Sequence, residues 1–174
     1  MLGEGRKFSL GLLPLFFLLA CNPVSDRDIF FDAVQKIETG GEPDPMLAIG
    51  LAGELGPYQI TYDYWEDSYK SNPLIGGTFE DVKGYAYGQQ VIGAYMERYA
   101  LDAWNAGDYL TCSRIHHGGP RGMEREHTIR YAERVLEEIA HRTSAFTLEI
   151  GDDSESTRDR EGSATLLGRS DGGL

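Results

Sequence analysis

The chain has 174 residues, 41% of them hydrophobic, and its formal net charge at pH 7 is −12. This length fits one domain with short extensions, and the hydrophobic content is enough for a real core. The strong negative charge argues against nucleic acid as a partner, and against a freely secreted protein that must first adhere to an anionic cell wall.

The first 20 residues have the pattern of an export signal. Arg6 and Lys7 precede an apolar stretch, residues 8–19, that is too short to span a bilayer comfortably. The stretch ends in Ala20-Cys21, which resembles a bacterial lipobox in which Cys21 becomes a lipidated N-terminus. An ordinary signal peptide cut near Ala20 is the alternative. The sequence therefore predicts an exported protein, either lipid-anchored on the periplasmic side of a membrane or secreted.

Removal of this signal makes the chain more acidic. Residues 1–20 hold two positive charges and one negative charge, so the net charge moves from −12 to −13. A protein tethered at the cell envelope does not need long-range attraction to an anionic wall. The charge and the lipobox therefore favour the same location.

The composition predicts a linker over 21–27, a folded domain over 28–142 and a polar, disordered tail over 143–174. Apolar spacing and turn residues predict the elements of the domain. In chain order these are a helix from Asp28 to Ile37, an irregular β-hairpin over 42–62, helices over 63–70 and from Thr78 through Met96, a short helix over 108–115, and a helix over 124–142. They indicate an α+β domain that is mainly α.

Three segments carry a resemblance to a known family. They are Lys36-Ile37-Glu38-Thr39-Gly40-Gly41, Gly56-Pro57-Tyr58-Gln59-Ile60 and Arg114-Ile115-His116-His117-Gly118-Gly119-Pro120. With these segments, residues 28–140 resemble the invertebrate-type lysozymes (destabilases) and their bacterial relatives. The resemblance implies a lysozyme-like fold and a glycosidase acting on peptidoglycan or a related N-acetylhexosamine polymer. It also implies that Glu38 is the catalytic general acid.

The chemistry of glycoside cleavage is consistent with a glutamate at this place. The reaction needs a protonated acid beside the leaving oxygen, and a carboxyl stays protonated near neutrality only where its surroundings disfavour charge. Glu38 is expected in the last turn of the first helix, where the helix dipole disfavours an anion. Neighbouring apolar side chains would add to that effect.

A second carboxylate is less easily assigned. In the family that this chain resembles, an aspartate follows the glutamate by about a dozen residues, and this position falls at Ile49 or Gly50. The nearest carboxylates are Asp44 and Glu54, and a small shift in the alignment would make Asp44 the second catalytic residue. Without one, the chain would be a lytic transglycosylase that uses one glutamate, or a degenerate peptidoglycan-binding lipoprotein.

Three further residues are candidates for substrate binding. Tyr58 offers a flat face to a sugar ring or, alternatively, belongs to the core, and Gln59 can bind N-acetyl groups. His116 begins the segment that resembles the family's His-Asn-Gly-Gly-Pro, which makes it a candidate for substrate binding, although it could instead hold the fold through a backbone hydrogen bond. Adjacent histidines suggest a metal, but no cysteine or carboxylate has suitable spacing, so we expect neither metal nor cofactor. We expect Cys112 to be a buried small residue.

Overall fold

The computed structural model describes the backbone of residues 25–164 and the side chains of residues 25–145. Six α-helices lie in this part of the chain: α1 (Asp26–Thr39), α2 (Tyr62–Ser71), α3 (Tyr85–Tyr99), α4 (Leu101–Ala106), α5 (Tyr109–Gly118) and α6 (His127–Ala164). Short 3-10 helices connect them: η1 (Pro45–Leu47), η2 (Pro73–Ile75), η3 (Phe79–Lys83) and η4 (Gly119–Glu124). The described domain is thus mainly helical, as predicted.

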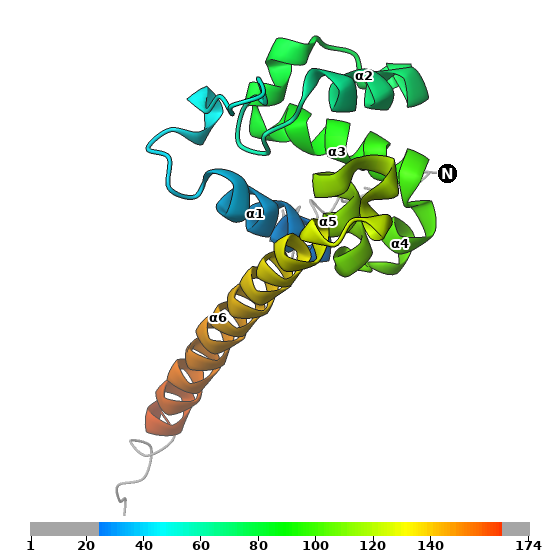
Figure 1. The fold of residues 1–174 in the computed structure, drawn as a ribbon. Coiled ribbons are helices and arrows are strands. Elements are labelled where there is room, and N and C mark those ends of the chain that lie inside the picture. Colours follow the sequence, from blue (N-terminus) through cyan, green and yellow to red (C-terminus); the bar gives the residue numbers. More distant parts are fainter. Residues whose placement is uncertain (1–24, 165–174) are drawn as a thin grey trace, which may run out of the picture.

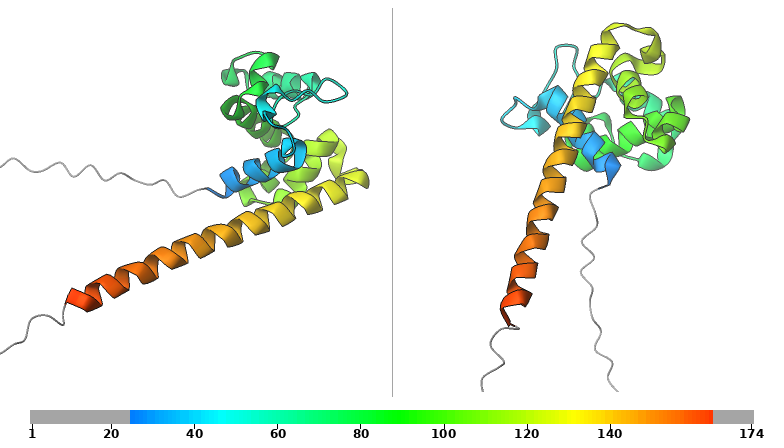
Figure 2. Two further views of the ribbon diagram at one scale, coloured as in Figure 1. Left: turned by 90° about the vertical axis from the view of Figure 1, so that its left-hand side faces the viewer. Right: turned by 90° about the horizontal axis from the view of Figure 1, so that it is seen from below.

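The helices form two groups. Helices α1 and α5 pack against the first half of α6, while α2 packs against α3 (Figure 1). The loop between α1 and α2 runs from the first group to the second. The far half of α6 projects away from both groups in each view (Figure 2).

Helix α1 begins with a capping box. The Ser25 hydroxyl accepts a hydrogen bond from the Asp28 backbone N–H, and the Asp28 carboxylate accepts one from the Ser25 backbone in return. The helix buries Phe30 and Val34 completely. With one face fixed in the core, the last turn of α1 places Glu38 beside the loop that follows.

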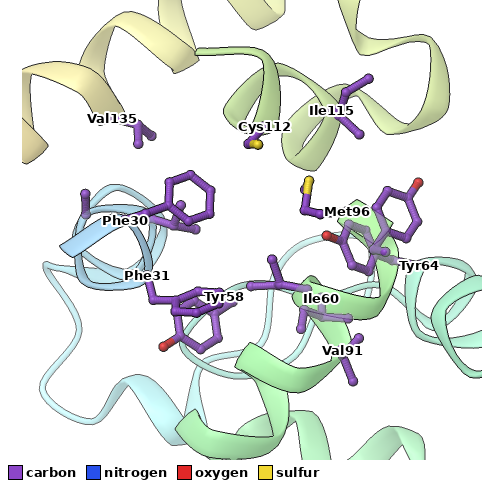
Figure 3. Close-up of a cluster of buried hydrophobic side chains, with 14 of the residues drawn as sticks. Phe30, Phe31, Tyr58, Ile60, Tyr64, Val91, Met96, Cys112, Ile115 and Val135 are labelled. Atoms are coloured by element: carbon purple, nitrogen blue, oxygen red, sulfur yellow. The ribbon is translucent and has the colours of Figure 1, made fainter. Parts of the chain in front are cut away.

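The core is built from all the main helices and from the loop between α1 and α2. Tyr58 and Ile60 from that loop insert among side chains of α1 and α3 (Figure 3). Cys112 of α5 is fully buried in the same cluster, and burial raises the pKa of its thiol to about 12. Cys112 is therefore a packing residue and not a nucleophile, as expected from the sequence.

The predicted β-hairpin over 42–62 is not formed. The described chain has no strand there, and the loop makes only two isolated bridges, between Ile49 and Leu55 and between Leu55 and Ile60. The backbone has a positive φ at Gly53, Gly56 and Gln59, which interrupts an extended ladder. Gly56 is required here, because a Cβ atom would lie 2.7 Å from the η3 backbone.

The helices differ from the predicted ones in four further places. Helix α3 begins at Tyr85 after the separate η3, and α4 was not predicted. Helix α1 already includes the last two residues of the predicted linker. Helix α6 continues to Ala164, through a segment expected to be disordered.

The remaining predictions for the two ends cannot be compared with the structure. Residues 1–24, which include the predicted signal and the lipidation site Cys21, lie outside the described residues, as do residues 165–174. Over the part of the chain that is described, no helix is both long and apolar enough to cross a membrane.

Candidate active site

Glu38 lies where the end of α1 meets the loop before α2. The Thr39 hydroxyl donates a buried hydrogen bond of 2.9 Å to the Pro57 carbonyl oxygen, which fixes the end of the helix against this loop. The Glu38 side chain is only 19% exposed. The first helix therefore delivers a carboxyl that is largely withdrawn from water.

Burial changes the protonation of Glu38. The pKa of its carboxyl is raised from 4.5 to about 7, mainly by loss of hydration and further by the negative charge of Glu54. Nearby Tyr131 and Arg134 oppose this shift. The Tyr131 hydroxyl is itself buried, and burial and the nearby Glu38 raise its pKa well above the ordinary value.

Two hollows meet at Glu38. The Asp44 hollow has a volume of about 370 Å³ and lies between the end of α1 and the segment 42–49. The His116 hollow has a volume of about 740 Å³ and is lined by the loop 50–61 and by parts of α2 and α5. Glu38 and Gln59 line both hollows, so together the hollows form one cleft with Glu38 at its middle. An extended polymer fits such a cleft better than a compact ligand does.

Gln59 lies in this cleft with an unusual backbone. Its φ is +47°, the only positive value at a non-glycine residue in the described chain. The side-chain amide donates a hydrogen bond of 2.9 Å to the Gly56 carbonyl oxygen, and the side chain is half-buried. A strained residue at the meeting point of two hollows suggests that its position serves binding.

His116 forms one wall of the cleft behind Glu38. Its Nε2 lies 3.9 Å from Glu38 Oε1, and its Nδ1 lies 3.2 Å from the hydroxyl of Tyr64. Burial lowers the pKa of His116 to about 4, so the imidazole is neutral at pH 7. The contact with Glu38 is therefore polar and not an ion pair. His116 therefore adds no positive charge that would lower the pKa of Glu38.

Tyr58 is not a cleft residue, in contrast to the substrate-binding role predicted for it. Its ring is 1% exposed and packs edge-on against Phe31 and Tyr85, while its hydroxyl accepts a hydrogen bond from Gln89. Tyr58 is thus a core residue, whereas the adjacent Gln59 lines the cleft. The sequence left two roles open for Tyr58, a sugar-binding surface or a core residue, and the structure agrees with the second.

The two candidates for a second carboxylate lie in different hollows. Asp44 is exposed, and its carboxylate accepts a hydrogen bond from the Met46 backbone N–H at the start of η1. Glu54 is half-buried in the His116 hollow, and its charge acts on Glu38. The structure thus brings Glu54, which the sequence analysis did not choose, into electrostatic contact with the expected acid.

The paired histidines have separate roles. His116 faces the cleft, whereas His117 stacks on the ring of Tyr131 with a centroid distance of 4.2 Å. Over the described residues, no group of three or more histidine, cysteine or acidic side chains is placed to hold a metal ion.

Comparison with known proteins agrees with the geometry of this cleft. The Destabilase family model matches residues 48–138, and a lysozyme of Magallana gigas is 34% identical over 100 residues, which cover 58% of this chain and 71% of that protein. The chain belongs to the Destabilase family. This membership makes it a lysozyme-like glycoside hydrolase and confirms the resemblance seen in the sequence.

The family match has a boundary that matters for the site. It begins at residue 48, so it includes Gln59 and His116 but not Glu38. The observations that single out Glu38 are therefore its position in the cleft and its raised pKa. The local sequence around Glu54 could not indicate that this residue lies near Glu38. The two come together only because the loop between α1 and α2 folds back toward the end of α1.

Proposed function

We propose that the protein is a muramidase that cleaves peptidoglycan between muramic acid and glucosamine, with Glu38 as the general acid. The observation that carries this proposal is a half-buried carboxyl with a pKa of about 7 at the middle of a cleft. Near neutral pH such a carboxyl still holds a proton that it can transfer.

The residues around Glu38 support this role. Protonated Glu38 donates its proton to the glycosidic oxygen as the bond to the anomeric carbon breaks. Neutral His116 stands behind the carboxyl without drawing off its proton. Gln59, which lines both hollows, can donate and accept hydrogen bonds with N-acetyl groups on either side of the cleaved bond.

The test compares the purified chain without residues 1–21 with its Glu38→Gln variant. Each is incubated with peptidoglycan sacculi, and the soluble products are identified by mass spectrometry. We expect the unmodified chain to release products with reducing-end muramic acid. We expect Glu38→Gln to lower their rate by about a hundredfold or more, because the amide keeps the shape but cannot donate the proton.

Other products would replace this proposal. Anhydro-muramyl products that depend on Glu38 would identify a lytic transglycosylase. A folded chain that binds sacculi and releases nothing over a range of pH would identify a peptidoglycan-binding protein that has lost hydrolysis. The half-buried Glu54 beside Glu38 favours the hydrolase, because a second carboxylate is what hydrolysis requires and transglycosylation does not.

We propose further that residues 1–20 direct export and that Cys21 carries a lipid anchor. The support is the lipobox-like sequence and the acidity of the chain, which a tethered enzyme tolerates better than a diffusing one. In cells fed an alkyne fatty acid, the full chain should become labelled and sediment with membranes, whereas Cys21→Ala should do neither. An unlabelled, soluble full chain would contradict the anchor and leave the muramidase proposal untouched.

A further inference from the structure

Hydrolysis of a glycosidic bond requires a second carboxylate besides the acid. Five carboxylates other than Glu38 line the described cleft, namely Glu42, Asp44, Glu54, Asp63 and Asp67. The contacts of these side chains separate them. Asp44 caps η1, and Asp67 accepts a hydrogen bond of 2.9 Å from the Tyr99 hydroxyl. Among these carboxylates, Glu54 is the one whose negative charge contributes to the raised pKa of Glu38, as a smaller addition to the effect of burial.

The loop holds the Glu54 carboxylate in a fixed place. Its Oε2 atom accepts a hydrogen bond of 2.9 Å from the Ala52 backbone N–H, and its carbonyl oxygen accepts one of 2.8 Å from the Gly50 N–H. Glu54 is thereby held to the same short turn once through its side chain and once through its backbone. A carboxylate that is fixed before substrate arrives is what a catalytic base or nucleophile needs.

Gly50 provides the space that Glu54 occupies. A Cβ atom on Gly50 would overlap Glu54 Oε2 and would lie 2.6 Å from the Gln59 side-chain oxygen. The φ of Gly50 is not positive, so its backbone would accept a side chain, and only the neighbouring side chains prevent one. The carboxylate of Glu54 and the amide of Gln59 therefore both lie against Gly50, in the space that a side chain at this position would fill.

We propose that Glu54 is the second catalytic carboxylate of this enzyme and reaches the reacting centre across Gly50. This inference rests on the proposed glycosidase function and replaces Asp44 as the partner of Glu38. The carboxylate that faces the substrate is then that of Glu54, four residues after Gly50 in the same turn.

The reaction can use Glu54 in two ways that balance. As a base, Glu54 takes a proton from water, the water oxygen bonds to the anomeric carbon, and the leaving oxygen departs with the proton of Glu38. As a nucleophile, Glu54 itself bonds to the anomeric carbon while the bond to the leaving oxygen breaks and that oxygen takes the proton of Glu38; water, deprotonated by the now ionised Glu38, then displaces Glu54 from the anomeric carbon. The first route inverts the anomeric configuration and the second retains it, so NMR of the first-formed product distinguishes them.

The first experiment measures release of reducing ends from sacculi by the Glu54→Gln variant. The glutamine can still accept the hydrogen bond from Ala52, so the turn should persist, but it can neither take a proton nor attack carbon. We expect activity to fall by about a hundredfold or more. Glu66→Gln is the matched control, because Glu66 pairs with Lys70 on α2 and does not line the cleft.

The second experiment moves the carboxylate to the neighbouring position. Glu54→Ala removes one of the two groups that would collide with a side chain on Gly50, and the other, the end of the flexible Gln59 side chain, has to shift. With that shift, the double variant Gly50→Asp/Glu54→Ala can place a carboxylate in the same space. We expect this double variant to be at least tenfold more active than Glu54→Ala. Circular dichroism and thermal melting establish that each compared variant is folded.

Two results would overturn the assignment. One is Glu54→Gln activity within threefold of the Glu66→Gln control. The other is a folded double variant that is no more active than folded Glu54→Ala. Both are read against an active parent chain, whereas an inactive parent would overturn the muramidase proposal itself, so failures of the two proposals are distinguishable.

Discussion

Burial of the Glu38 carboxyl has an energetic consequence that depends on pH. Its pKa is about 7 in the folded chain, against 4.5 for a fully hydrated glutamate such as the unfolded chain presents. Below pH 4.5 both states hold the proton. Between pH 4.5 and 7 the unfolded chain releases it first, so stability falls as pH rises, by at most about 3 kcal/mol in total. The same raised pKa is what supplies a proton donor near neutral pH.

Replacement of Glu38 should therefore stabilise the fold at high pH while it removes activity. We expect Glu38→Gln to unfold at a higher urea concentration than the unmodified chain at pH 8, because no charge has to remain buried. The difference should shrink below pH 5, where Glu38 is neutral in both states. Urea unfolding at several pH values measures this, and equal stability at pH 8 would show that Glu38 is not buried as described.

A substitution at Gln59 should likewise change activity with little change in the free energy of unfolding. Asparagine tolerates a positive φ better than glutamine does, but its amide is one methylene shorter and cannot reach as far into the cleft. We expect Gln59→Asn to keep its free energy of unfolding within about 1 kcal/mol and to lose about tenfold in the rate of sacculus digestion. Full activity in this variant would exclude a role for the Gln59 amide in binding.

Single residues were predictable to different degrees. Glu38 could be placed from the sequence because apolar spacing fixes a helix face and Gly40-Gly41 fixes its end. The burial of Tyr58 could not, since it depends on packing against Phe31 of α1 and Tyr85 of α3, which are distant in the sequence. The closeness of Glu54 to Glu38 depends on long-range loop closure, which leaves no periodic signal.

At the scale of elements, the site depends on how α1 is joined to the loop that follows it. The Thr39 hydroxyl is shared between its own helix and the loop, accepting from the Gln35 amide and donating to the Pro57 carbonyl oxygen. This bond links the turn that holds Glu38 to the segment that holds Gln59. This buried contact helps to fix the acid relative to the binding residue.

Loss of that contact should affect both stability and catalysis. Thr39→Val keeps the side-chain shape, removes the hydroxyl and leaves the Pro57 carbonyl oxygen buried without it, which should cost about 1–3 kcal/mol. We also expect activity to fall several-fold because the loop is less firmly placed. Thermal melting and sacculus digestion measure the two effects. The control, Ser144→Ala on exposed α6, should change stability by less than about 0.5 kcal/mol, and a Thr39→Val chain that matches it would contradict this role.

The prediction of a β-hairpin over 42–62 was wrong because of the backbone turns within this segment. Residues 42–62 contain β-prone segments, but glycines with positive φ turn the chain before two strands can align. The helices were easier to predict because their hydrogen bonds are local. The short α4 escaped prediction because it has no more than six residues, too few to show a period.

At the scale of the whole molecule, the net charge of −12 governs the approach to an anionic substrate. Repulsion extends over about 30 Å at 0.01 M salt and over about 8 Å at 0.15 M. We therefore expect digestion of sacculi by the soluble chain to become faster as salt rises across this range. An uncharged N-acetylglucosamine oligomer should show no such increase, and a decrease on sacculi would show that a local positive surface outweighs the net charge.

The central claim is that Glu38 holds a proton near neutral pH, and a direct titration tests it. The chain is labelled with ¹³C at glutamate side chains, and the carboxyl signal that is missing in Glu38→Gln is followed by NMR from pH 3 to 9. The structure predicts a midpoint of about 7. A midpoint near 4.5, the value of an ordinary glutamate, would contradict the account, because the cleft would then lack its acid at the pH where the enzyme is proposed to act.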